Sequence, residues 1–444
     1  MASREARRTG KRFASLRSRR SNYAHSRRKI NRIRGPTAAS VPLILGRSLE
    51  GALITLYGCI QLRISRGLEG IRKTSLSVNG VLFGAHFEKV DTMLFGTVSA
   101  TFPQLKDWIG SSGFSIQHPN RDTFVITEQS SFLATTALSD FKLSIGFSFS
   151  EHGGEGEFGI QYVPYVSIEF NKQIHLKRIL ELLYHLSNFF ALASHHPIYA
   201  ESIKVFTEAK KVVLPPDGKS FQLPIELVYE NVNWGVPHDQ VSITEMLFEF
   251  SKIRSRFDNI MQNWFDKAEL LEPINGMYSG TLYNSHMYLQ QKFLSLVQCV
   301  ESYDRRVLRR IDVSKEEAEK RVADILDATP TKYKDWLKNK LRYSNEPTLR
   351  KRLEQLVQTF SFVDFENVGQ FIEDVVNTRN YLTHYDEVQK QSSATPERMS
   401  WLALKLGMLT EAILLAELGL SLDEVKLITQ RTKQRLAGWR ILTF

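Results

Sequence analysis

The sequence contains little cysteine. Its 444 residues include only two cysteines, Cys59 and Cys299, and both lie in apolar-leaning surroundings. Neither belongs to a Cys-x-x-Cys pair or to a cysteine and histidine cluster with metal-ligand spacing. A disulfide framework and a cysteine-based metal site are therefore excluded, and we expect two buried free thiols in a reducing cytosol.

Long apolar runs are missing as well. The longest candidate, residues 413–420, is short and is interrupted by Glu417, whereas a helix that spans a bilayer needs roughly 20 apolar residues. The N-terminus lacks the apolar stretch of a secretory leader. We therefore expect a cytoplasmic protein with no membrane contact.

Familiar catalytic and cofactor motifs are also absent, including a phosphate-binding loop and a nucleophile elbow. Residues 154–159 match Gly-x-Gly-x-x-Gly, but strand-like runs flank them, so no helix N-terminus is available for a pyrophosphate. Glu155 and Glu157 would also repel phosphate. We interpret the segment as a hairpin loop and expect no cofactor.

The His195-His196 pair precedes Pro197 at a predicted helix end. Adjacent histidines can bind a metal, but no carboxylate or cysteine lies at ligand spacing. We expect a helix terminus with histidine near the last carbonyl groups, and no metal.

Charge is concentrated in one segment. Residues 1–35 hold 13 lysines and arginines and one acid, Glu5, so this segment carries a net charge of +12, whereas the whole chain carries +10. The other 409 residues hold 45 bases and 47 acids, a charge of −2. The body of the protein is therefore nearly neutral, which excludes a protein that coats nucleic acid with its whole surface.

Residues 1–40 are poor in apolar side chains and end in a linker-like stretch. We expect this basic tail to be disordered. Its composition fits a transit peptide, a nucleic-acid-binding arm or upstream sequence translated from a misassigned start codon, and the sequence does not choose among them.

Strand-like segments dominate from about residue 43 to 170. Short runs rich in β-branched and aromatic residues are separated by turn residues, and Asn79-Gly80 indicates a hairpin. The clearest runs are residues 52–64, 76–83, 93–102, 123–127, 142–149 and 165–170. A helix is predicted over 176–193, followed by irregular structure to about residue 236.

The apolar period changes to that of a helix from about Ser242. Ser314 and Glu317 form a predicted capping box, and Thr395-Pro396 opens another helix. Expected helices cover 242–267, 281–310, 314–328, 331–342, 347–361, 366–385 and 396–417, with a final piece from Ser421.

The sequence thus predicts an α+β protein of two domains, an antiparallel β-rich N-terminal domain followed by an all-α bundle. We expect the basic tail at 1–40, the β-rich domain at 41–240, a helical connector at 241–280 and the bundle at 281–444.

One helical segment, residues 371–385, has an unusual distribution of polar residues. At about 100° per residue, four polar side chains share one stripe and the apolar side chains lie opposite. The stripe contains Glu373, Asn377, Asn380 and His384, and the apolar face contains Phe371, Ile372, Val375, Val376 and Leu382. Arg379 falls in the middle of the apolar face. Because a guanidinium keeps its proton, it must meet a carboxylate, a phosphate or water there.

Glu301, on an earlier predicted helix, has two possible roles. It either pairs with Arg379 or faces solvent, and from the sequence we favour the solvent-facing position.

The phrase Arg379-Asn380-Tyr-Leu-Thr-His384 resembles the Arg-x(4–6)-His motif of the HEPN superfamily, often with asparagine directly after the arginine. Residues 293–306 resemble the first helix of HEPN domains of the ApeA type, which are bacterial anti-phage proteins. A β-rich domain before the bundle is similar to the ApeA arrangement. The resemblance is firmer over 281–420 and looser over 43–240.

This resemblance implies a metal-independent endoribonuclease effector of a defence system that arrests infected cells. Arg379 would bind the phosphate, His384 would act as general acid or base, and Asn380 would orient either of them. The products would carry a 2′,3′-cyclic phosphate and a 5′-hydroxyl.

Arg379 and His384 lie about 140° apart on a regular helix. They converge on one phosphate only if the helix frays or if two chains share the site. HEPN nucleases are thought to dimerise in this way, so we expect a homodimer through the bundle.

Two alternatives remain. The bundle could be a non-catalytic module that binds RNA or nucleotide or acts as a scaffold, or the basic tail could make the chain a DNA-binding protein. The RNA cut, tRNA or mRNA, and the phage-derived trigger expected at the N-terminal domain are not specified by the sequence.

Overall fold

The computed structural model describes residues 40–66, 72–111, 113–120, 123–128, 132–154, 157–214, 218–229 and 243–431. The basic tail and its predicted disorder lie outside the described residues. The chain divides into two compact units. The first comprises residues 1–95 and 202–239, and the second comprises residues 96–201 and 240–444.

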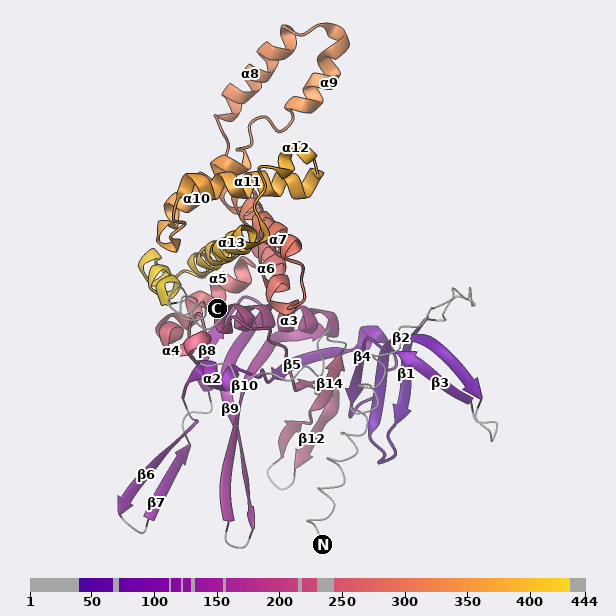
Figure 1. Ribbon diagram of the computed structural model, residues 1–444. Coiled ribbons are helices and arrows are strands. Elements are labelled where there is room, and N and C mark those ends of the chain that lie inside the picture. Colours follow the sequence, from indigo (N-terminus) through magenta and orange to yellow (C-terminus); the bar gives the residue numbers. More distant parts are fainter. Residues whose placement is uncertain are drawn as a thin grey trace. The chain divides into compact units, whose positions relative to one another are not determined.

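The first unit is built on an antiparallel sheet (Figure 1). Its strands follow the order β1-β2-β4-β14-β11, and β3 pairs with the remaining part of β2. Their bounds are β1 Ser40–Arg47, β2 Leu53–Arg66, β3 Arg72–Ser77, β4 Gly80–Phe83, β11 Ile203–Phe206 and β14 Ile225–Tyr229. A separate hairpin joins β12 (Lys211–Leu214) to β13 (Lys219–Gln222).

The hairpin predicted at Asn79-Gly80 is wrong. Strands β3 and β4 flank this dipeptide, but each pairs with β2 rather than with the other. The backbone N–H of Asn79 donates to the carbonyl of Tyr57 at 3.1 Å, opposite Gly58, whose φ is +60°. Strands β3 and β4 therefore follow one another along β2, and the break between them at Asn79 lies opposite Gly58, where the positive φ of glycine lets β2 kink.

The second unit contains the sheet order β5-β10-β9-β8. The bounds are β5 Leu94–Ala100, β8 Phe132–Ala137, β9 Phe141–Gly154 and β10 Glu157–His175. Strands β6 (Phe114–Asn120) and β7 (Thr123–Glu128) form a further hairpin. Strands β9 and β10 pair antiparallel up to Gly154 and Glu157, as expected for the two strands of a hairpin, and the predicted turn between them lies outside the described residues.

An aromatic cluster forms the core where this sheet meets the helices. Phe189 and Phe190 of α3 (Leu176–Ser194) pack edge-on against Trp108 of α2 (Leu105–Ile109). Trp264 of α5 (Phe257–Asp266) contacts Phe189, and Phe250 of α4 (Phe250–Ile253) contacts Trp108. Burial of each such ring contributes roughly 1.5–3 kcal/mol to the free energy of folding.

The remaining described residues form the helical bundle, as predicted (Figure 1). Its helices are α6 Ala268–Tyr283, α7 Leu289–Tyr303, α8 Lys315–Asp327, α9 Thr331–Leu341, α10 Leu349–Thr359, α11 Val368–His384, α12 Glu387–Lys390 and α13 Pro396–Glu417. The predicted caps are confirmed, since the side chains of Ser314 and Thr395 accept from the N–H groups of Glu317 and Arg398.

Helix α13 is the one described helix that is long and apolar enough to cross a membrane by length and composition. Its apolar window is 78% buried within the protein, where it packs against α7. This burial is that of a core helix. The α+β prediction of a β-rich region followed by a helical bundle is confirmed.

Two regions differ from the sequence prediction. Residues 202–229, expected to be irregular, contain β11 to β14. Residues 241–280 were expected to be a helical connector, but the bounds of α6 within it were not predicted, and Pro273, Gly276 and Gly280 of this helix are typical helix breakers. Burial of Leu271, Ile274 and Tyr278 outweighs that propensity.

Candidate functional site

Helix α11 carries the Arg-x4-His phrase. At its start the side chain of Asn367 accepts from the N–H of Gln370 at 3.1 Å, a standard N-cap. Phe371, Ile372, Val375 and Leu382 are buried, which anchors one face of the helix in the bundle. The predicted packing face is therefore present, although Val376 at its edge is only half-buried.

Arg379 lies at the edge of this packed face, with 33% of its side chain exposed. Its Nη1 donates to Oδ1 of Asn380 at 3.2 Å, and its Nη2 lies 3.6 Å from Oε2 of Glu301 on α7. Glu301 does not simply face solvent as expected, because its side chain is only 20% exposed and approaches the guanidinium. The anomaly of an arginine near an apolar face is thus resolved by a carboxylate.

The Glu301 contact leaves Arg379 able to bind an anion. At 3.6 Å the two groups attract electrostatically without a normal hydrogen bond. Among the described residues the guanidinium hydrogen-bonds only to Asn380. A guanidinium has five N–H donors, so donors remain for phosphate oxygens.

His384 is the last residue of α11 and is exposed. The helix ends regularly, because Tyr385 adopts a left-handed conformation with φ of 51° and donates its N–H to the carbonyl of Tyr381 at 2.6 Å. Fraying near His384, one of the two ways in which the motif could converge on one phosphate, is therefore absent from this end of the described helix. Five helical positions still separate His384 from Arg379, so the backbone does not turn both residues to one side.

The end of α7 that positions Glu301 is fixed by a buried charge cluster that the sequence did not reveal. Asp304 is fully buried and pairs with Arg352 of α10 at 2.7 Å and with Arg310 at 3.2 Å. Arg352 also pairs with Glu346 at 3.1 Å and donates to the carbonyl of Pro347 at 2.8 Å. The pattern Asp304-Arg305-Arg306 contains the acid, but its partners are distant in the sequence.

Two titratable groups on α7 lack the properties of a catalytic group. Burial raises the pKa of the Cys299 thiol to about 12. Burial and the nearby Glu417 carboxylate, which accepts a 2.7 Å hydrogen bond from Tyr303, raise the pKa of the tyrosine hydroxyl far above its usual value. Both groups stay protonated at neutral pH, and the prediction that both cysteines are buried free thiols is confirmed.

The His195-His196 pair lies elsewhere, at the end of α3. His195 caps the helix in a left-handed conformation, as expected for a helix terminus. Its Nε2 lies 3.1 Å from Oε1 of Glu411, a carboxylate that Tyr278 also contacts at 2.9 Å. Among the described residues no group of three or more His, Cys, Asp or Glu side chains is arranged to hold a metal ion.

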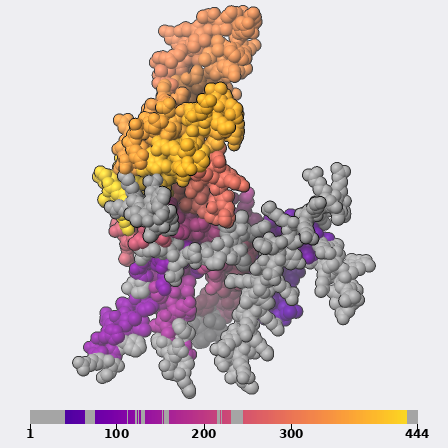
Figure 2. All heavy atoms as spheres, in the orientation of Figure 1, coloured from indigo at the N-terminus to yellow at the C-terminus, as the bar shows by residue number. Residues whose placement is uncertain are grey.

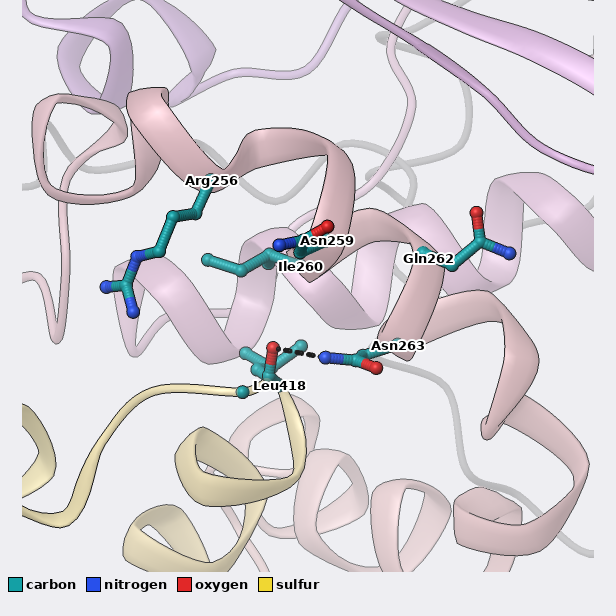
Figure 3. A pocket seen from close by; sticks show the side chains of 7 residues that line it. Arg256, Asn259, Ile260, Gln262, Asn263 and Leu418 are labelled. Carbon is teal, nitrogen blue, oxygen red and sulfur yellow. Dashed lines mark hydrogen bonds between the residues drawn. The ribbon is translucent and has the colours of Figure 1, made fainter.

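A small cavity of about 240 Å³ lies between α5 and the end of α13 (Figure 3). Arg256, Asn259, Gln262 and Asn263 provide its polar lining. Arg256 is paired with Glu424 at 2.5 Å, and Asn263 donates to the carbonyl of Leu418 at 3.0 Å. The cavity contains none of the motif residues, so it is not the site that the sequence predicts.

Comparison with protein families identifies both parts of the chain. The model of ApeA N-terminal domain 1 matches residues 15–264, and the model of the Apea-like HEPN domain matches residues 294–424. The second match includes Glu301, Arg379, Asn380 and His384. No curated protein and no solved structure matches the chain.

The first match covers more than half of the chain, and the second covers the helical bundle that carries the motif. The order of the two matches agrees with the β-rich region followed by helices. The chain therefore belongs to the ApeA family, with an ApeA N-terminal domain followed by an ApeA-like HEPN domain.

Proposed function

We propose that the protein is a metal-independent endoribonuclease that acts as the effector of a bacterial anti-phage system in the cytoplasm. The observation that carries the proposal is the state of Arg379. A partly exposed arginine next to Asn380 is held by a loose ion pair on a helix that ends at an exposed histidine. HEPN domains are typically nucleases, which makes RNA the substrate class.

The chemistry needs no metal. The 2′-hydroxyl of RNA attacks the adjacent phosphorus, the 5′-oxygen leaves, and a 2′,3′-cyclic phosphate forms. Arg379 would exchange its contact with Glu301 for the phosphate oxygens and stabilise the charge that develops there. His384 would transfer the proton from the 2′-hydroxyl to the leaving 5′-oxygen, because an imidazole can accept and donate a proton. Asn380, hydrogen-bonded to Arg379, would orient the guanidinium or the phosphate.

A homodimer would bring these residues together. Arg379 and His384 are five helical positions apart on a regular helix, so an arginine and a histidine from two chains would line one cleft more readily than those of one chain. Exposed apolar side chains lie beside His384. Tyr385 is 66% exposed and Val388 of α12 is 81% exposed, and a partner chain would cover them.

In this proposal the β-rich region senses a phage-derived trigger and restrains the bundle. The alternative is a non-catalytic RNA-binding or scaffolding module. The retention of both Arg379 and His384 favours the nuclease, since HEPN-like bundles that have lost catalysis usually lose one of the two.

The decisive experiment compares wild type, His384→Ala and His286→Ala on total cellular RNA with EDTA present. His286 is an exposed histidine three residues before the start of α7 and outside the Arg-x4-His phrase, so it is a matched control. We expect the control to cleave RNA and to be toxic in cells. His384→Ala should lose both properties, with unchanged circular dichroism. If wild type cuts no RNA and His384→Ala protects cells as well as wild type, the binding module is correct.

A further inference from the structure

Helices α8 and α9 form a hairpin that extends beyond α11 and α12 in Figure 1 and that no other described segment covers in Figure 2. Neither helix contains a buried residue. The hairpin is closed at its base by Asn345, whose side chain accepts from the N–H of Val313 and donates to its carbonyl, each at 3.0 Å. It therefore adds almost nothing to the core, and its surface requires another explanation.

Helix α9 has an exposed face that combines aromatic and basic residues. Trp336 is 61% exposed and Tyr333 is 48% exposed. At about 100° per residue, Lys332, Tyr333, Trp336 and Lys340 lie within about 100° of one another. Leu337 and Leu341, on the adjoining side, are half-buried. The four residues thus share one solvent-facing surface, which we call the α9 face.

The charges of this region point to an anionic partner. Residues 331–342 contain five lysines and arginines and a single acid, Asp335. Within the described part of the chain no acid lies within ion-pairing distance of Lys332 or Lys340, whereas Lys334 reaches Asp327 at 4.0 Å. Because the chain outside the basic tail carries −2, any affinity of this part of the chain for RNA must come from local clusters such as this one.

The exposed rings of Tyr333 and Trp336 indicate that the anionic partner contains unpaired nucleotides. Bases stack on exposed aromatic side chains only when they are not stacked in a duplex, while lysines contact the phosphates on either side. The Nζ atom of Lys332 lies over the Tyr333 ring, 4.7 Å from its centre. A base that stacks on this side of the ring would replace the ammonium, which would then contact a neighbouring phosphate. From Lys332 to Lys340 the face runs about 12 Å along the helix, enough to follow a short single strand.

We propose that the α9 face is a docking surface for single-stranded or looped RNA, through which the protein holds its substrate. This inference rests on the proposed ribonuclease function for the identity of the substrate. The binding itself is a property of α9 and does not require cleavage.

The test measures RNA binding in the full-length His384→Ala background, so that cleavage does not interfere. Fluorescence anisotropy follows a labelled single-stranded RNA of mixed sequence and the same RNA as a duplex, across a salt series. The variants are Tyr333→Ala with Trp336→Ala, and Lys332→Gln with Lys340→Gln. The matched control is Lys320→Gln with Ile325→Ala, on the exposed surface of α8.

We expect each lost aromatic ring to weaken single-strand binding by about 5- to 100-fold, with little effect on the duplex. Lys332→Gln with Lys340→Gln should reduce the slope of the logarithm of the binding constant against the logarithm of the salt concentration by about 1.4. The control variant should bind RNA as tightly as the His384→Ala protein. Wild-type affinity of the aromatic variant for the single strand would overturn the proposal. So would unchanged RNA binding together with loss of the dimer in light scattering, which would make α9 a contact between copies of the chain.

The two proposals fail separately. If wild type cleaves RNA but the α9 variants bind normally, the ribonuclease stands and the docking surface is wrong. If wild type never cleaves RNA but the α9 variants lose single-strand binding, the docking surface stands on a binding module.

Discussion

Among the described residues Arg379 has one carboxylate neighbour, Glu301, and their separation of 3.6 Å determines how strongly Glu301 binds the guanidinium. A close, bidentate pair would occupy the guanidinium, whereas this looser contact holds the charge near the helix surface and leaves donors available. Glu301 therefore holds the arginine by a loose contact, which a phosphate of the RNA would replace in the mechanism that we propose.

A double-mutant cycle tests this contact. For Glu301→Gln and Arg379→Ala we expect a coupling free energy of about 0.5 kcal/mol in urea unfolding, small because both groups are partly exposed. Coupling near zero would mean that the two side chains do not interact in solution. The same cycle with Glu316→Gln, an acid on the exposed hairpin, in place of Glu301→Gln should give no coupling.

The sequence predicted the individual residues of the site better than their partners. Helical spacing separated the polar stripe of α11 from its buried face, and it showed that Arg379 needed a counter-charge. It named Glu301 as a possible counter-charge but favoured a solvent-facing position for it, because the two residues are 78 positions apart and one sequence contains no information on which distant helices touch.

At the scale of elements, the end of α7 depends on charges rather than on apolar packing. Asp304 opens a π-helical turn, Asp304–Leu308, and both its partners are arginines. Arg352 is only 2% exposed, so it is one of the most deeply buried charges of the described bundle. Such a pair is costly to break, since the remaining charge stays buried.

Asp304→Asn should therefore destabilise the protein by about 3 kcal/mol, because Arg352 and Arg310 lose their shared carboxylate. Chemical denaturation of wild type and variant measures the change. Asp312→Asn is the control, since Asp312 pairs with Lys351 at 2.7 Å on the surface and its loss should cost less than about 1 kcal/mol. Equal losses for the two variants would show that burial of Asp304 has no special importance.

In contrast to Asp304, the hairpin of α8 and α9 is expected to contribute little to stability. Replacement of residues 314–344 by a short glycine and serine linker should leave the unfolding temperature of the bundle nearly unchanged, because neither helix has a buried residue. Scanning calorimetry measures this directly. A large drop, or loss of a cooperative transition, would show that the hairpin supports the bundle.

Element prediction failed where tertiary contacts outweighed local preference. Capping residues and apolar spacing placed α8, α9, α11 and α13 within two residues of their observed ends. The bounds of α6 were not predicted within the expected helical connector, because its proline and glycines oppose a helix that burial then stabilises. The strands β11 to β14 are four or five residues long, too short for their alternation to stand out.

At the scale of the whole molecule, the proposed dimer predicts complementation between two inactive variants, which a monomer would not show. If each active site combines Arg379 of one chain with His384 of another, two inactive variants can complement each other. We expect Arg379→Ala and His384→Ala to be inactive alone, and their co-expressed, co-purified mixture to recover a measurable part of wild-type RNA cleavage.

Light scattering of each preparation is the companion measurement and should give the mass of two chains. An active protein with the mass of one chain would contradict the dimer. A mixture that stays inactive although hetero-dimers form would place both residues of a site in the same chain.

The contacts of Asn345 at the base of the hairpin also bear on how the hairpin could be replaced. The Asn345 side chain bonds to the main chain of Val313, and the N–H of Asp312 donates to the carbonyl of Asn345 at 3.0 Å. A chimaera that keeps Asp312, Val313 and Asn345 should therefore fold with a hairpin of another length or sequence, without repacking of the bundle.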